Sequence, residues 1–139
     1  MSISQILDIA STGMAAQRLR VQLIASNIAN SETTRTKEGG PYRRKEAVFQ
    51  AQDLGFSGAL ANAGVRVASI RTSQEPFLTR YEPSHPDANA DGVVSYPNVN
   101  PVEEMVNLTE ASRAYEANIA VVRAAKAMAS SALEILRVQ

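Results

Sequence analysis

Apolar residues recur at alternating steps of three and four along two segments, one at each end of the chain: Ser2 to Asn30 and Val102 to Leu136. This spacing is typical of a heptad seam along an α-helix. Residues 31–100 lose the helical rhythm and contain many Gly, Pro, Asp and Asn residues between short β-branched runs. The pattern predicts a mainly α fold, in which long N- and C-terminal helices form a coiled coil around a small β-rich middle insert. We expect three regions: 1–30, 31–100 and 101–139.

The N-terminal helix has a recognisable start. Ser2 followed by Gln5 has the form of a capping box, so we expect the helix to begin at about residue 3. Asn27 and Asn30 suit its end, because Asn tolerates the left-handed conformation beyond a last turn. Gly13 lies inside the helix, where it is either simply tolerated or allows close approach by a neighbour. The predicted seam consists of Ile3, Leu7, Ala10, Met14, Gln17, Val21, Ile24 and Ile28.

The C-terminal helix has three coincident start signals. Asn100 can cap it, Pro101 can take the first helical position, and Glu103 can reach back to the cap. At 1.5 Å per residue this helix would be about 50 Å long. The predicted seam consists of Met105, Leu108, Ser112, Tyr115, Ile119, Val122, Lys126, Ala129, Leu133 and Leu136.

Neither seam can be buried by its own helix. Burying the two against each other repays only part of the backbone entropy lost on ordering both helices, so we expect frayed ends in the monomer that become ordered on assembly. Gln17, Ser112 and Lys126 are polar residues at seam positions. We predict that they fix register or partner choice at some cost in stability.

The middle of the chain reads as short strands and turns. The expected strands are Tyr42 to Gln50, Val65 to Ile70, Phe77 to Tyr81 and Val93 to Tyr96. We expect Phe77 to Tyr81 to pair with Val65 to Ile70 across a turn around Ser73 to Pro76. Leu54 to Gly64, between the first two strands, is rich in Gly and Ala.

Composition narrows the possible functions. The 139 residues suit one modest domain, and 14 basic residues balance 14 acidic ones, which argues against nucleic acid as a partner. The absence of Cys excludes disulfides and thiolate chemistry. No window approaches the roughly 18 consecutive apolar residues of a membrane span, and the N-terminus lacks the pattern of a secretory signal. If the protein leaves the cytoplasm, we expect it to do so uncleaved.

Residues suited to catalysis are sparse. The single histidine, His85, lies between Ser84 and Pro86, and no Gly-x-Ser-x-Gly elbow or glycine-rich nucleotide loop is present. We therefore interpret His85 as a loop residue, and we expect neither an enzyme nor a cofactor.

Two polar clusters allow more than one interpretation. Asp87 to Gly92 matches the first half of a calcium loop, but Asn98 stands where that loop needs a bidentate carboxylate, so a structured turn is favoured over an ion site. Arg43, Arg44 and Lys45 form a small basic cluster. It is either a solvated strand edge or an electrostatic match to a neighbouring subunit.

Several motifs carry a family resemblance. Asn27-Ile28-Ala29-Asn30, closing an amphipathic N-terminal helix, resembles the motif shared by flagellar rod, hook and hook-associated proteins. Further motifs resemble those of the proximal rod proteins and cover nearly the whole chain in order: Thr33 to Thr36, Glu38 to Arg44, His85 to Ala88, Asp91-Gly92, Tyr96 to Asn100 and Ser112 to Asn118.

The resemblance implies a polymer subunit. Similar proteins are exported uncleaved through the flagellar type III apparatus and assemble in the periplasm into the rod, which transmits torque from the basal body to the hook. It further implies that the terminal helices pack around a central channel, with the middle segment further out. The partners it implies are copies of the chain itself and the rod proteins FlgB, FlgF and FliE. A generic helical adaptor outside the flagellum is the alternative.

Overall fold

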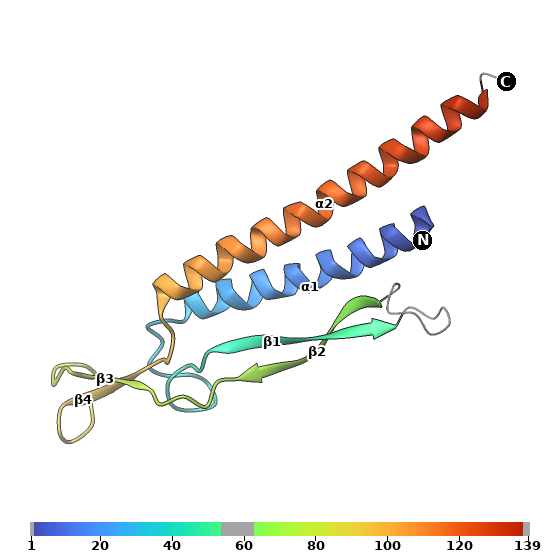
Figure 1. Cartoon of the computed structure of the whole chain (residues 1–139). Coiled ribbons are helices and arrows are strands. Elements are labelled where there is room, and N and C mark those ends of the chain that lie inside the picture. The colour runs from blue at the N-terminus through green and yellow to red at the C-terminus, as the bar shows by residue number, and fades with distance from the viewer. Residues whose placement is uncertain (1, 54–62, 138–139) are drawn as a thin grey trace.

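The computed structural model describes residues 2–53 and 63–137. Its elements, in chain order, are α1 (Ile3–Ala29), β1 (Lys45–Asp53), β2 (Ala63–Thr72), β3 (Leu78–Tyr81), β4 (Val93–Tyr96) and α2 (Pro101–Arg137) (Figure 1). Two long helices flank a small antiparallel strand region, which confirms the predicted fold class. Most of the Leu54 to Gly64 segment lies outside the described residues. Within the described part, neither helix is long and apolar enough to cross a membrane.

The start of α1 is the predicted capping box. The Ser2 hydroxyl accepts the N–H of Gln5 at 3.3 Å, and the Gln5 side chain accepts the N–H of Ser2 at 2.7 Å. The end differs from the expectation, because Asn30 has a φ of −105° and is not left-handed. Its side-chain amide instead donates to the carbonyl of Ser26 at 2.8 Å and closes the last turn.

The start of α2 uses two of the three expected signals. Pro101 is its first residue, and the Asn100 side-chain oxygen accepts the N–H of Val102 at 3.1 Å. Among the described residues, the Glu103 side chain makes no hydrogen bond back to the Asn100 cap, and Glu103 is exposed. Its neighbour Glu104 is the acidic residue that turns inward.

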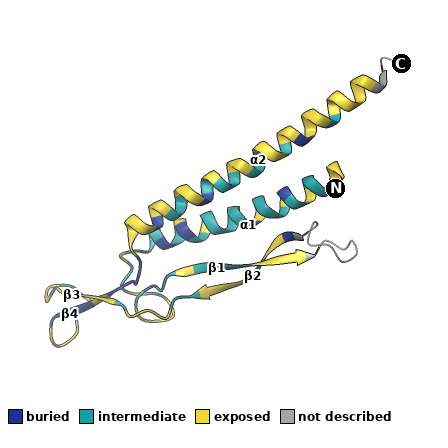
Figure 2. Cartoon of the chain, in the orientation of Figure 1, coloured by how far each residue is buried: buried dark blue, intermediate teal, exposed yellow. Residues whose placement is uncertain are grey.

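The three layers of the molecule follow from the position of α1. This helix lies between α2, which runs antiparallel to it, and the β1–β2 hairpin (Figure 1). The side chain of Thr12 accepts the N–H of Val65 at 3.1 Å and ties α1 to β2. Because α1 is covered from two sides and α2 from one, α2 is exposed along most of its length (Figure 2).

The strand pairing differs from the prediction. β1 pairs with β2 from Lys45 opposite Thr72 to Asp53 opposite Ala63, with a bulge at Val48/Phe49, and β3 pairs with β4. The expected pairing of Phe77 to Tyr81 with Val65 to Ile70 is therefore wrong. The Asn98 amide donates to the Ser73 hydroxyl and to the Glu75 carbonyl, each at 3.1 Å. These bonds hold the chain after β2 away from a tight hairpin turn and direct it towards β4.

Candidate assembly surface

Three contacts fix the register of α1 against α2. A Cβ added at Gly13 would lie 3.2 Å from the Asn118 amide, a guanidinium nitrogen of Arg20 lies 3.8 Å from the Glu110 carboxylate, and the Asn27 amide donates to Glu104 at 2.9 Å. The first of these contacts resolves the two interpretations of Gly13. The missing side chain lets α2 approach closely.

The α2 residues that α1 buries are not the predicted ones. Glu104, Ala111 and Ala125 are buried, and their spacing in multiples of seven marks one heptad position, to which Asn118 also belongs. The prediction placed Met105, Ser112, Ile119 and Lys126 at this position, one residue later in each heptad. Small Ala side chains bring the two backbones together, whereas the sequence pattern favoured the larger neighbouring side chains.

The predicted seam residues of α2 consequently divide into two groups. Leu108, Tyr115 and Val122 are half-buried, as are Ser112 and Ile119. Met105, Lys126 and Leu133 are exposed, with Met105 at 60% and Leu133 at 63% of their full accessibility. A single chain therefore leaves part of this seam uncovered.

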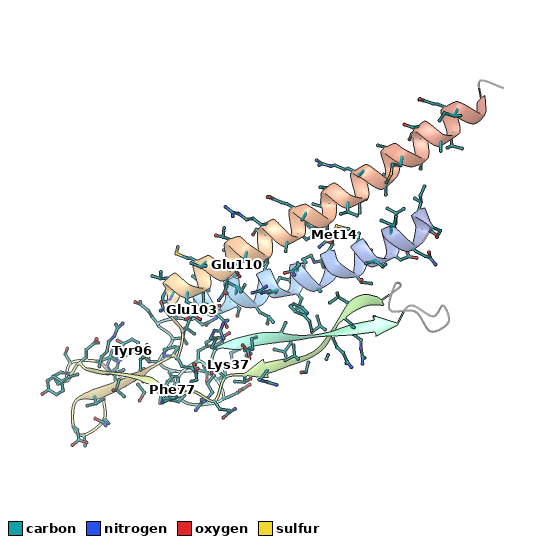
Figure 3. The ribbon with its side chains drawn as sticks, in the orientation of Figure 1. Met14, Lys37, Phe77, Tyr96, Glu103 and Glu110 are labelled. Atoms are coloured by element: carbon teal, nitrogen blue, oxygen red, sulfur yellow. The ribbon has the colours of Figure 1, made fainter. Side chains whose placement is uncertain are left out.

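The predicted seam of α1 is covered better. Ile24 is buried, and Leu7, Met14, Gln17, Val21 and Ile28 are half-buried. Figure 3 shows Met14 on the side of α1 that faces α2. The side-chain oxygen of Gln17 is buried without a hydrogen-bond partner among the described residues, which is a costly arrangement in an apolar contact.

An open groove of about 400 Å³ runs between the two helices on the side away from the hairpin. It is lined by Arg18, Val21, Ser112, Tyr115 and Glu116. Residues seven apart on a helix share a face, so Met14 and Ile28 lie on the same side as Val21, and Met105, Ile119 and Lys126 on the same side as Ser112. The predicted seam thus borders this groove, at the edge of the contact within the chain.

A buried polar cluster joins α1, β1 and α2 at the other end of the helix pair. Asn27 is fully buried, and its side-chain oxygen accepts from the Tyr42 hydroxyl at 2.9 Å and from the Lys45 N–H at 3.0 Å. Its amide donates to the Lys45 carbonyl at 2.8 Å and to Glu104. Asn27 therefore makes four hydrogen bonds, which is the full capacity of its side chain.

Glu104 and Arg44 form the charged part of this cluster. The Glu104 side chain is 1% exposed, and its second oxygen accepts from the Arg44 Nε at 2.8 Å. Burial opposes the charge of Arg44, but the hydrogen bond and the charge of Glu104, assisted by Glu46, outweigh it and raise the pKa of the guanidinium. The Arg44 backbone N–H donates to the side chain of Asn98 at 3.0 Å, which extends the cluster to the start of α2.

Two comparisons with known proteins bear on this arrangement. The family described as "Flagella basal body rod protein" matches residues 7–37, and "Flagellar basal body rod FlgEFG protein C-terminal" matches residues 90–135. Proteins called "Flagellar basal-body rod protein FlgC" from Borreliella burgdorferi and Salmonella typhimurium are each 44% identical to this chain. The matches cover 99% of both chains for the first and 92% of this chain and 93% of the relative for the second. A Bacillus subtilis protein of that name is 41% identical over 93% of this chain and 95% of its own.

The chain belongs to the FlgC family of flagellar basal-body rod proteins. Three of the motifs that first indicated this membership meet in the structure. Asn27 comes from the first, Tyr42 and Arg44 from the second and Asn98 from the third, and all four lie in one cluster. Sequence reasoning found the motifs but not the cluster, since partners far apart in sequence carry no local signal. An adaptor outside the flagellum is not favoured by these matches.

The basic cluster of this FlgC-family chain is engaged within the chain. The Arg43 guanidinium lies 4.2 Å from the centre of the Phe77 ring and donates to the Ser73 carbonyl, and Arg44 belongs to the buried cluster. Both are half-buried, so the interpretation as a solvated edge fits only Lys45, which is exposed.

His85 and the Asp87 to Gly92 turn have partners within the chain. The His85 Nδ1 accepts the N–H of Asp87 at 3.1 Å, and the Asp87 carboxylate accepts from the Thr34 hydroxyl at 2.8 Å. The Asn89 side-chain oxygen accepts two backbone N–H groups, from Asp91 and Val93. The described residues contain no group of three or more His, Asp or Glu residues placed to hold a metal ion. These bonds give the turn a local structural explanation.

Proposed function

We propose that this chain is a structural subunit of the proximal flagellar rod that polymerises through its two terminal helices. The observation that carries the proposal is the apolar surface that one chain leaves uncovered on α2. Met105, Leu133 and Ile135 are each at least 60% exposed there. Large apolar side chains exposed at both ends of one long helix are unusual for a protein that acts as a monomer, so they favour contact with further subunits.

The buried polar cluster suits a part that transmits torque. Hydrogen bonds of Asn27, Arg44 and Glu104 connect α1, the start of β1 and α2. Nearly all polar groups of these side chains therefore have partners within the chain. Such a network holds the three elements at a fixed geometry, because relative movement would leave buried polar groups without partners. We infer that the helices of each subunit behave as one stiff unit in the rod.

The proposed partners are copies of this chain, the rod proteins FlgB, FlgF and FliE, and the export apparatus during secretion. The proposed location is the periplasmic rod, reached without cleavage of a leader. The fold supports retention of residues 3–29 in the assembled protein, because they form one continuous helix packed on α2 and on the hairpin. Removing them would expose the inner faces of both.

We also propose that the role is structural and not catalytic. His85 and Asp87 are engaged in the turn that they build, as described above. The relatives carry the name of a rod protein and of no enzyme.

Basal-body fractionation tests the proposal. A flagellated strain that carries this chain in place of its own FlgC should swim, and the chain should remain with purified basal bodies after detergent and high salt. A strain without either protein should lack rods. Recovery of the chain only in the cytoplasmic fraction of a swimming strain would instead support an adaptor role.

A further inference from the structure

One imidazole supports the turn between β3 and β4. His85 is the single histidine of the chain and is half-buried. Its Nδ1 accepts the backbone N–H of Asp87 at 3.1 Å, and its ring meets the Tyr96 ring of β4 edge-on, with the two ring centres 6.2 Å apart. The backbone N–H of His85 donates to the Glu82 carbonyl at 3.0 Å. A ring nitrogen that accepts a hydrogen bond carries no proton, so this arrangement requires neutral His85.

Two carboxylates beside His85 tie the turn to its surroundings. The Asp87 carboxylate accepts from the Thr34 hydroxyl at 2.8 Å, which connects the turn to the segment that follows α1. On the other side, the Glu82 carboxylate accepts from the Tyr96 hydroxyl at 2.9 Å, which connects the turn to β4. The position of the segment after α1 therefore depends on a turn whose geometry includes a titratable acceptor.

We propose that His85 is a pH-sensitive switch that holds this turn closed when neutral and loosens it when protonated. Histidine is the side chain that ordinarily changes charge between about pH 5 and 8. A protonated ring carries N–H on both nitrogens, so Nδ1 and the N–H of Asp87 would be two donors facing each other. The ring then has to leave this N–H. The carboxylates of Glu82 and Asp87 can accept its new proton, in competition with the hydroxyls that they now bind.

The charges around His85 determine the direction of the response. They are the acidic Glu32, Glu82, Asp87 and Asp91 and the basic Arg35 and Arg80, of which Arg35 lies 3.7 Å from Asp87 and Arg80 lies 4.6 Å from the centre of the Tyr96 ring. The acidic groups outnumber the basic ones, so they stabilise a charged ring once it has left the N–H of Asp87. The closed turn binds one proton fewer than the loosened turn. Lowering the pH therefore shifts the population towards the loosened turn, and raising it restores the closed one.

NMR of the full-length chain tests the switch at the hydrogen bond itself. When the pH is lowered from about 8 to about 5, the Asp87 amide resonance should shift with the same midpoint as the His85 ring. His85→Asn is the matched variant, because an Asn side-chain oxygen accepts the N–H two residues later without titrating, as Asn89 does for Asp91 in this same turn. In this variant the Asp87 amide should keep its resonance over the same range.

Limited proteolysis measures whether the loosening reaches the segment after α1. Glu32 is exposed there, and a glutamate-specific protease that stays active in mild acid can cleave after it. The ratio of wild-type to His85→Asn cleavage removes the pH dependence of the protease. This ratio should be about one at about pH 8 and rise about two- to tenfold at about pH 5, which corresponds to the loss of one hydrogen bond.

Three results would overturn the switch. An Asp87 amide that does not follow the His85 ring would show that the hydrogen bond is indifferent to the proton. The same titration in His85→Asn would assign the effect to the carboxylates. A cleavage ratio that stays near one at both pH values would show that the segment after α1 does not respond.

Discussion

The side-chain amide of Asn27, near the end of α1, donates a hydrogen bond of 2.9 Å to the carboxylate of Glu104, in the first turn of α2. The two residues are separated by 77 positions and are both buried. The second carboxylate oxygen binds Arg44 at 2.8 Å, so one side chain joins the two helices to the start of β1. Most of the fixed geometry at this end of the molecule depends on Glu104.

Replacing Glu104 by Ala should therefore destabilise the fold strongly. The substitution leaves the Arg44 guanidinium and the Asn27 amide without their partner, and breaking a buried ion pair from one side costs about 3–5 kcal/mol. Urea unfolding followed by circular dichroism measures the change. Glu103→Ala, at the exposed neighbouring position, is the control and should change stability by less than about 0.5 kcal/mol. Equal effects of both substitutions would show that the cluster contributes little.

Gly13 and Asn118 should be energetically coupled. Ala in place of Gly favours a helix by about 1 kcal/mol, but here its Cβ would press on the Asn118 amide at 3.2 Å. We expect Gly13→Ala alone to be close to neutral and to stabilise the protein by about 1 kcal/mol once Asn118 is also replaced by Ala. A double-mutant cycle from urea unfolding measures this coupling. Additive effects would mean that the close approach imposes no constraint.

How far the sequence predicts this structure depends on the range of each interaction. The helices and their starts were predictable because capping at Ser2 and Asn100 and heptad spacing are local. The exact α2 seam was not, since the choice between Ala111 and Ser112 depends on how closely two backbones approach. The pairing of β3 with β4 and the cluster around Asn27 depend on contacts between distant segments, and alternation along a strand does not identify its partner.

Hydrogen exchange can test whether the terminal helices are frayed in the monomer. The predicted fraying of the terminal helices remains a prediction, and the position of α1 between α2 and the hairpin suggests where it should be greatest. The contacts of Gly13 with Asn118 and of Asn27 with Glu104 place the start of α1 opposite residue 128, so residues 129–137 of α2 extend beyond it. We expect these residues to be the least ordered part of a dilute monomer, because they lie past the end of α1. Hydrogen exchange should be fastest in their amides and slowest near Ala111. If circular dichroism of the dilute protein showed fully formed helices, and thermal unfolding were cooperative and independent of protein concentration, the predicted fraying would be contradicted.

Ile119 tests the importance of the groove side of α2 for assembly. It is half-buried and lies one heptad from Ser112, on the side of the groove. A carboxylate there would have to be desolvated when another subunit covers it, which is unfavourable. We predict that Ile119→Asp abolishes motility while the chain is still exported. Ala90→Asp, at an exposed turn, should swim normally. A motile Ile119→Asp strain would rule out a packing role for this face.

Lys126 tests whether polar seam residues determine register. Lys126 is exposed in the single chain and lies in line with Ser112 and Ile119 along the groove side of α2. Lys126→Leu should remove the polar entry of this seam position while adding exposed apolar surface. We expect less selective association, with aggregation of the purified chain and reduced swimming. Lys126→Arg keeps the charge and should preserve both. Normal rods and normal swimming in the Leu variant would show that this lysine does not select the register.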